Sequence, residues 1–500
     1  MSGRVAASIR VWRARTVRTS GDRAYVVYLA LMVALVAVAP FARAVWLSVT
    51  SAESIAVFAS PAAPRVTPLV VAALWAGAML VGRDRGPALR PPFLTHALAT
   101  SDLPRTGAFR GPLQRAGALL TVLTAVAAGL VFVGARGDGA VEPLALGMFV
   151  AVGALVGVIA AVAWLAGQAL PRAALPVALG VLTLGVATAA APGLQPFTPW
   201  GWIGLLYPGT GSAHALPALI ALVAVSFALL ATVPILMNRL GLTELLAQAT
   251  RWDSATTHAT GMDLGAATAV YQNRPHRGRR LRAVRSVRSW AWMFLVRDAV
   301  GAVRTPGRLI VGVLALAAGA TLITLSFAPA APAWALGSAA GVIVFAGLGP
   351  LTDGIRHAAS IAADYPIYGV SDEQLLAGHA LFPFAVTVVV LLAVVAACAL
   401  VVGVGGAAPL VSALAVGLLA IAARVSNAVK GPLPPALLTP IPTPMGDLGA
   451  AVRLAWALDG ILFAALAGAA AVTVFAAPLL LIGVPAALIG IGVQRWRHRR

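Results

Sequence analysis

The basic residues of this chain are confined to alternate loops between long apolar stretches. Of 36 Lys and Arg residues, only Arg43, Arg65 and Arg136 fall outside one alternating set of loops. Loops rich in Arg and Lys beside transmembrane segments stay in the cytoplasm. The pattern therefore predicts a polytopic membrane protein with an even number of crossings and both termini in the cytoplasm.

The apolar stretches predict an all-α protein, since about 20 apolar residues in a helix cross the hydrocarbon core. About twelve transmembrane helices are expected. Their ranges are 24–44, 66–82, 116–134, 143–166, 174–193, 214–237, 308–328, 333–350, 379–403, 407–423, 455–474 and 476–493. The last two could instead form one hairpin that enters the membrane without crossing it. Gly153 and Gly157, four residues apart, are expected to pack against another helix.

A low-identity repeat divides the chain. Gly86-Pro87-Ala88-Leu89 and Gly349-Pro350-Leu351-Thr352 each end an expected span and begin a polar loop. Six helices per half would leave the halves parallel. We expect a first six-helix half over residues 1–237, a cytoplasmic connector over 238–305 that carries an amphipathic interfacial helix, and a second half over 306–500.

Charge and composition restrict the partners. A net charge of +20 would suggest nucleic acid for a soluble protein, but here the basic loops flank apolar spans. Anionic membrane lipid is therefore the expected partner, and nucleic acid is not. One lysine against 35 arginines, with abundant Ala, Gly and Val, is typical of a high-GC bacterial genome. We therefore expect the protein to reside in the bacterial plasma membrane.

Catalytic and metal-binding patterns are missing from the sequence. There is no G-x-x-x-x-G-K-[ST] phosphate loop, the seven histidines are scattered, and Cys398 is the single cysteine. No catalytic residue, cofactor or metal is expected, and the protein is not expected to be an enzyme. The acidic residues lie in loops or near helix ends, with Asp459 expected near the cytoplasmic end of its helix, whereas ion-driven carriers usually place titratable groups at membrane depth.

Three motifs carry more specific information. The segment Trp290–Arg308 predicts a helix at the inner membrane surface, with Trp292, Leu295, Ala299 and Val303 on one stripe and charges off it. The residues assigned to it are Trp290, Trp292, Arg297 and Arg304. The segment Gln195–Gly209 is too apolar for a solvated loop and too rich in Pro and Gly for a span. It predicts a short re-entrant outer gate with Pro199, Trp200, Trp202 and Pro208, or simply an aromatic belt.

The third motif is a pair of cytoplasmic loops, 83–115 and 351–378. Ser371 and Gln374 have the spacing of a capping box, and Gly378 follows. This predicts a short exposed helix that a partner could grip, although a solvated turn is the simpler interpretation. The candidate docking residues are Leu103, Arg105, Ser371, Asp372, Glu373, Gln374 and Leu376.

Together these residues resemble the membrane subunits of type-2 ABC exporters, in the fused, actinobacterial-like form with two six-helix halves. Arg304-Thr305-Pro306 is similar to the Arg-x-Pro element before a half in that family. The loops 83–115 and 351–378 correspond to its coupling-helix loops, and Thr198-Pro199-Trp200-Gly201-Trp202 resembles its outer Ser-Pro-x-Gly-Trp element. The second half departs from the family pattern. It lacks an outer re-entrant element and instead has the proline-rich loop 430–453 on the inner side.

The resemblance implies an export pathway driven by two separate ATP-binding subunits, for a hydrophobic or amphipathic small molecule, lipid or peptide. A gradient-driven twelve-helix carrier is an alternative. A non-transporting membrane scaffold that binds an ATPase is another.

Overall fold

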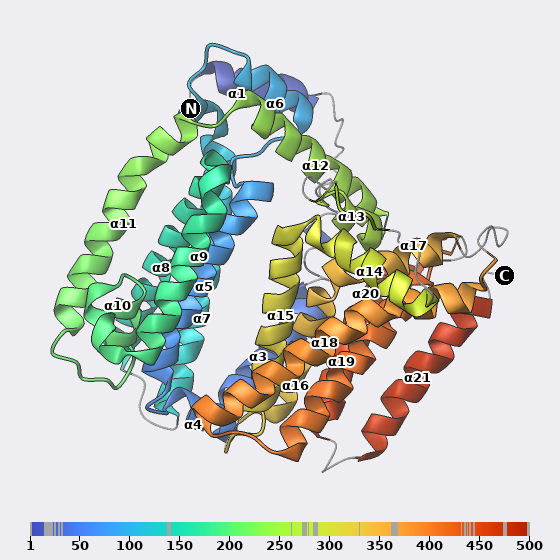
Figure 1. The fold of residues 1–500 in the computed structure, drawn as a ribbon. Coiled ribbons are helices and arrows are strands. Elements are labelled where there is room, and N and C mark those ends of the chain that lie inside the picture. Colours follow the sequence, from blue (N-terminus) through green and yellow to red (C-terminus); the bar gives the residue numbers. More distant parts are fainter. Residues whose placement is uncertain are drawn as a thin grey trace. The chain divides into compact units, whose positions relative to one another are not determined.

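The fold is almost entirely helical in the part of the chain that the structure, a computed structural model, describes (Figure 1). Its one sheet there is an antiparallel pair of two-residue strands, β1 (Pro442–Thr443) and β2 (Gly446–Asp447). The described residues are 3–14, 24, 27–28, 31, 34–137, 142–261, 263–272, 278, 280–283, 289–329, 331–361, 369–431, 433–434, 437, 439, 442–443, 446–473 and 478–497.

Ten helices among the described residues are long and apolar enough to cross a membrane. They are α5 (Ala63–Asp84), α7 (Arg105–Arg136), α8 (Pro143–Ala169), α9 (Pro171–Ala190), α11 (Ala215–Asn238), α15 (Pro306–Leu325), α16 (Ala333–Gly347) with the 3₁₀ turn Gly349–Leu351 that extends it, α18 (Asp372–Val402), α19 (Ala407–Ala428) and α20 (Leu448–Val472). Proline begins α8, α9 and α15, where its missing N–H costs no helical hydrogen bond. The chain is a multi-pass membrane protein.

The two other expected spans are not among these ten. Part of the range 24–44 lies outside the described residues, and its described end forms a π-helical turn, Ala34–Val38, followed by α3 (Ala39–Val49). The last expected span corresponds to α21 (Pro478–Arg497), a 20-residue helix. Twelve crossings and cytoplasmic termini therefore stay predictions.

The chain forms two compact units, Met1–Thr257 and His258–Arg500. Their boundary falls inside α12 (Leu242–Thr260), within the stretch expected to connect the halves. That stretch also contains α13 (Leu264–Ala269) and α14 (Trp290–Val303).

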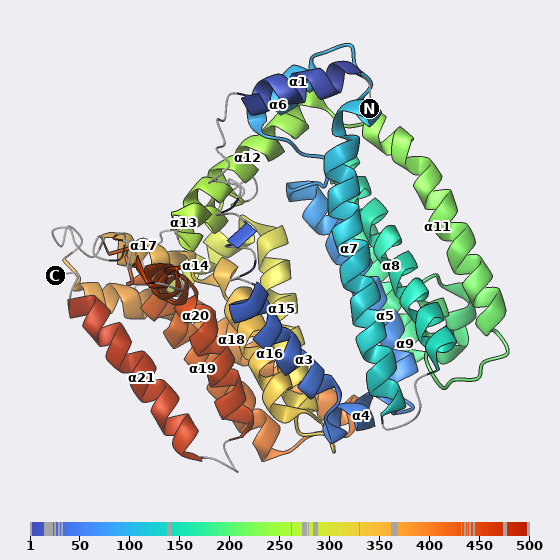
Figure 2. The same ribbon diagram turned by 180° about the vertical axis from the view of Figure 1, so that it is seen from behind.

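In the first unit, α5 packs against both α8 and α9, while α7 and α11 pack on α8 (Figures 1 and 2). Smaller helices complete it: α1 (Gly3–Ala14) contacts α6 (Pro92–Ala99), and α4 (Ala52–Phe58) contacts α7. The expected packing of Gly153 and Gly157 is confirmed. A Cβ atom on Gly153 would lie 2.7 Å from the Thr124 carbonyl oxygen of α7, so only glycine allows this approach.

In the second unit, α16 packs against α15, α19 and α20, and α21 packs on α19 and α20. Glycine again permits the closest crossing, since a Cβ atom on Gly337 of α16 would lie 2.6 Å from the Gly468 carbonyl oxygen of α20. Leu316, Ile323, Val344 and Leu391 fill the core between these helices.

The two units share a pairing pattern around the repeated Gly-Pro. The helix that precedes each Gly-Pro, α5 or α16, packs on the second and third long helices that follow it, α8 and α9 or α19 and α20. A short helix comes directly after each Gly-Pro, namely α6 in the first unit and α17 (Asp353–Ile361) in the second. The first unit has an extra short helix, α10 (Gly201–Leu205), before its last long helix.

Candidate functional site

Helices α14, α17 and α18 of the second unit meet at a buried histidine. The side chain of His379, on α18, is fully buried, and its Nδ1 lies 2.7 Å from Asp298 Oδ2 of α14. Its Nε2 lies 3.5 Å from Arg297 Nη1. A neutral imidazole with its proton on Nδ1 satisfies both neighbours, because it donates to the carboxylate and accepts from the guanidinium. Two charged residues of α14 thus hold α18.

Two glycines allow the three helices to come this close. A Cβ atom on Gly354 of α17 would lie 2.5 Å from Asp298 Oδ2, and one on Gly378 would lie 2.5 Å from the Phe294 ring. The Phe294 ring in turn packs on His379, with ring centroids 4.8 Å apart. Any larger side chain at these two positions would separate the helices.

An ion pair fastens α17 to the start of α15. Arg308 donates two parallel hydrogen bonds to the carboxylate of Asp353, at 2.8 and 3.2 Å, and Arg356 pairs with the same carboxylate. A bidentate pair fixes direction as well as distance. On the other side of α17, Ile355, Ala358 and Ala359 are buried. The short helix is therefore held by α14, α15 and α18 together.

The exposed face of α17 carries His357. Burial, and then the charges of Arg297 and His379, hold the pKa of His357 below its ordinary value, while Asp298 acts in the opposite direction. His357 therefore tends to stay neutral where an isolated histidine would be protonated.

The first unit holds its short helix α6 by a different device. The Gln248 side-chain oxygen accepts hydrogen bonds from the backbone N–H of Gly86 and from the amide of Gln168, at 3.1 and 3.0 Å. The Gln168 oxygen accepts from the N–H of Ala88 at 3.2 Å. Two buried glutamines thus lock the loop that leads into α6, whose Phe93 is 62% exposed.

The predicted capping box is confirmed, but the helix that it begins is not a short one. Ser371 and Gln374 exchange hydrogen bonds between side chain and backbone, at 3.2 and 3.3 Å. The helix does not end near Gly378 and runs on as α18 to Val402. Gly378 lies inside it because the residue is needed for packing on Phe294, not for a turn. The short helix of this loop is α17.

The other predicted docking residues have mixed surroundings. Glu373 accepts a hydrogen bond from Trp496 Nε1 of α21 at 3.2 Å, and Asp372 lies in the first turn of α18. Leu376 is half-buried against the Phe294 cluster, and Leu103 is half-buried in the first unit. Arg105 is the first residue of α7. A docking role for these residues stays a prediction.

The outer segment forms a short, broken element that packs on the first unit. A 3₁₀ turn, Pro192–Phe197, precedes α10, and α10 contacts α5 and α11. Pro199 directly precedes the buried Trp200, whose Nε1 donates to Thr188 Oγ1 at 3.1 Å, and the Nε1 of Trp202 donates to the Pro196 carbonyl at 2.8 Å.

Tyr207 and Pro208 follow α10. The Tyr207 hydroxyl donates to the Phe58 carbonyl oxygen at 2.8 Å, and burial raises the pKa of Tyr207 to about 12. The expectation of a packed, proline-broken segment is therefore confirmed in its local structure, and its role as a gate stays a prediction.

Helix α14 exposes Trp290 and Trp292, as a helix on the membrane surface should. Trp292 and Val303 of the expected membrane-facing stripe are exposed, and a different face of α14 packs on the rest of the unit. Phe294 and Ala302 are buried, and Arg297 and Asp298 face His379. The charges point inward because His379 gives them a partner. Arg304 does not face lipid either, since it donates to the carbonyl oxygens of Gly278 and Leu281.

Asp459 lies inside α20 and not at its end, because the helix begins at Leu448, earlier than expected. Lys430 Nζ lies 2.9 Å from Asp459 Oδ1, and Arg495 pairs with the other carboxylate oxygen. Two cations thus compensate this charge. Burial lowers the pKa of Lys430, against the effect of its bond with Asp459.

Sequence reasoning missed His379, Gly354, Gln168 and Gln248. For His379 and Gln168 the available signal was a polar residue next to glycine in an apolar helix, but the partners of both residues are distant in sequence. Within the described part of the chain, no group of three or more His, Cys, Asp or Glu side chains could hold a metal ion. No protein-family model matches this chain, and no curated protein or solved structure matches it either.

Proposed function

We propose that this chain is the membrane-spanning permease subunit of an ATP-driven exporter of the ABC type-2 kind, working in the bacterial plasma membrane with both termini in the cytoplasm. Separate ATP-binding subunits supply the energy, and the substrate is hydrophobic or amphipathic. The observation that carries the proposal is the pair α6 and α17. Each is a short helix that directly follows a spanning helix and a Gly-Pro, with one face buried and the other exposed.

The contacts of α17 would transmit a movement of this helix to the neighbouring helices. A push on its exposed face reaches α15 through Asp353 and Arg308, and reaches α14 and α18 through the contact of Gly354 with Asp298 and His379. Close-packed elements of this kind move as rigid bodies and do not deform gradually. In the first unit, α6 is held by Leu94, Thr95 and Leu98 on its buried face.

The test is to purify the tagged protein with its partners from native membrane in mild detergent. We expect a stoichiometric ATP-binding subunit, with ATPase activity that disappears when the phosphate-loop lysine of that subunit is replaced. Phe93→Ser, on the exposed face of α6, should reduce the amount of bound subunit. Leu281→Ser, at a second exposed apolar residue outside the spans, is the matched control and should not.

Two results would overturn the proposal. A protein that is stable alone, has no ATP-binding partner and transports only along an ion gradient would be a secondary carrier. A bound ATPase without substrate movement in reconstituted vesicles would indicate a scaffold.

A further inference from the structure

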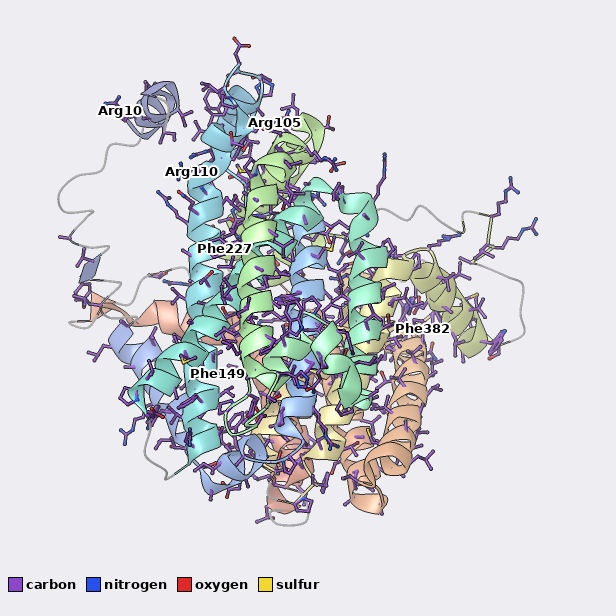
Figure 3. All side chains as sticks on the ribbon, turned by 90° about the vertical axis from the view of Figure 1, so that its left-hand side faces the viewer. Arg10, Arg105, Arg110, Phe149, Phe227 and Phe382 are labelled. Carbon is purple, nitrogen blue, oxygen red and sulfur yellow. The ribbon has the colours of Figure 1, made fainter. Side chains whose placement is uncertain are left out.

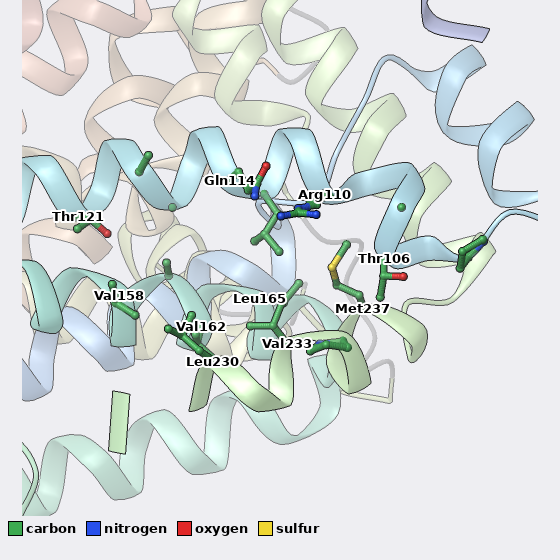
Figure 4. A pocket seen from close by; sticks show the side chains of 17 residues that line it. Thr106, Arg110, Gln114, Thr121, Val158, Val162, Leu165, Leu230, Val233 and Met237 are labelled. Carbon is green, nitrogen blue, oxygen red and sulfur yellow. The ribbon is translucent and has the colours of Figure 1, made fainter. Parts of the chain in front are cut away.

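A cavity of about 730 Å³ lies within the first unit, between α7, α8 and α11. This volume is in the usual range for sites that bind small molecules. Figure 4 shows its lining, with Thr106 and Arg110 toward one end, Thr121 and Val158 toward the other, and Gln114 between them. The rest of the wall between these ends is apolar and includes Val162, Leu165, Leu230 and Val233.

The cavity has one charged lining residue, Arg110, and no acidic one. Figure 3 shows Arg110 close to Arg105 at one end of α7, with Phe149 toward the opposite end of the same bundle. This is the end that the distribution of basic residues predicts to face the cytoplasm, where anionic lipid headgroups lie. The polar end of the cavity thus complements a negative group.

The cavity also has the length of one membrane leaflet. Arg110 and Thr121 are eleven residues apart on α7, which corresponds to roughly 16 Å along a helix. That is about half of the ~30 Å hydrocarbon core. An occupant with its charged group at Arg110 would therefore keep its apolar part within one leaflet, because Thr121 lies only about 8 Å inside the expected span that begins at residue 116.

The wall opens sideways between α7 and α11. Ala118 of α7 and Pro234 of α11 are exposed, and Leu230 is 44% exposed, although all three line the cavity. In a spanning helix these exposed residues face lipid, so a chain from the surrounding leaflet has a direct route in.

We propose that this cavity binds one anionic phospholipid of the inner leaflet, with its headgroup phosphate on Arg110 and Gln114 and an acyl chain along the wall formed by Val162, Leu165 and Leu230. The proposal is independent of the exporter function, because it depends only on the first unit and its surrounding lipid.

The test measures lipid retention by native mass spectrometry, with the purified full-length protein in mixed micelles that contain either phosphatidylglycerol or phosphatidylcholine. We expect Arg110→Gln to weaken retention of phosphatidylglycerol about fivefold, the value of one arginine near a charged headgroup, and to weaken retention of phosphatidylcholine less, because its choline group already neutralises the phosphate. Arg115→Gln is the control, since Arg115 is exposed on the same helix and does not line the cavity.

A second pair of variants tests the apolar wall. Ala118→Leu narrows the exposed side of the cavity and should weaken retention of both lipids, whereas Ala127→Leu, at an exposed alanine of α7 outside the cavity, should weaken neither. The proposal is overturned if Arg110→Gln and Arg115→Gln behave alike, if the wild-type protein retains both lipids equally, or if Ala118→Leu retains them as well as the wild-type protein does.

Discussion

At the scale of single residues, the packing of α14, α17 and α18 in the second unit depends on a histidine that has no contact with water. His379 is fully buried, and Asp298 on α14 is its nearest charged partner. A buried polar group that loses its partner costs about 1 to 3 kcal/mol. The pair therefore holds α14 on α18 more firmly than a surface ion pair would.

Replacement of Asp298 tests this contribution. Asp298→Asn keeps the shape and an acceptor oxygen but replaces a charged hydrogen bond by a neutral one, so we expect a loss of about 1 kcal/mol of stability, seen as a lower midpoint of thermal unfolding in detergent. Asp253→Asn, at an exposed carboxylate of α12, should leave the midpoint unchanged. Equal midpoints for the two variants would contradict the role assigned to the pair.

Gly354 gives a prediction of packing. In Gly354→Ala the new methyl group would overlap the carboxylate of Asp298, so α17 must move and the protein should lose stability. Gly301→Ala on α14 is the control, because nothing lies within 4 Å of its added Cβ atom. There alanine should stabilise the helix by roughly 0.5 to 1 kcal/mol. A destabilised Gly301→Ala together with an unaffected Gly354→Ala would contradict this account.

His357 should make stability depend weakly on pH. Its folded pKa lies below its ordinary value, so the unfolded chain binds the proton more readily. Stability should therefore decrease as the pH falls through the ordinary histidine value of 6.5 and should level off below the folded pKa. His357 is exposed, so the effect is small.

His357→Asn is expected to reduce the dependence of the thermal unfolding midpoint on pH between about pH 5 and 8. This variant keeps the charged and titratable neighbours Arg297, His379 and Asp298. If the unfolding midpoint changed with pH as much as in the wild-type protein, the pH dependence would come from these neighbours and not from His357.

At the scale of elements, sequence patterns predicted where helices begin better than how they face their neighbours. Ser371 and Gln374 are local signals, and the capping box was predictable from spacing alone. The inward face of α14 was not, because Arg297 and Asp298 count as surface residues until His379, some 80 residues later in the chain, is placed against them. A glycine such as Gly378 is equally ambiguous, since turns and tight packing both require it.

The short helix α10 gives the prediction at this scale. Trp200→Phe removes the hydrogen bond to Thr188 but keeps most of the contact with Trp75. We expect a loss of about 1 kcal/mol and easier proteolysis of the segment 195–209. Phe197→Leu is the control, because Phe197 is 81% exposed. Equal proteolysis of both variants would show that the tryptophan does not anchor α10.

At the scale of the whole molecule, the apolar stretches predicted the ten described helices that are long and apolar enough to cross a membrane, because length and polarity are local properties. The cavity between α7, α8 and α11 was not predictable, since its lining comes from three separate segments. The orientation of the helices across the membrane is predicted from the uneven distribution of Arg and Lys between the two sets of loops, which is a property of the whole chain.

Sidedness can be measured across α11. The chain has one cysteine, Cys398, which is buried in an apolar helix, so Cys398→Ala gives a background without thiols. In that background, Ala213→Cys and Thr256→Cys place single exposed thiols on either side of α11. Its 24 residues span about 36 Å, more than the ~30 Å core. An impermeant maleimide added to intact cells should label Ala213→Cys alone, and Thr256→Cys should react only after lysis. Labelling of Thr256→Cys in intact cells would reverse the orientation, and with it the assignment of Arg110 to the inner leaflet.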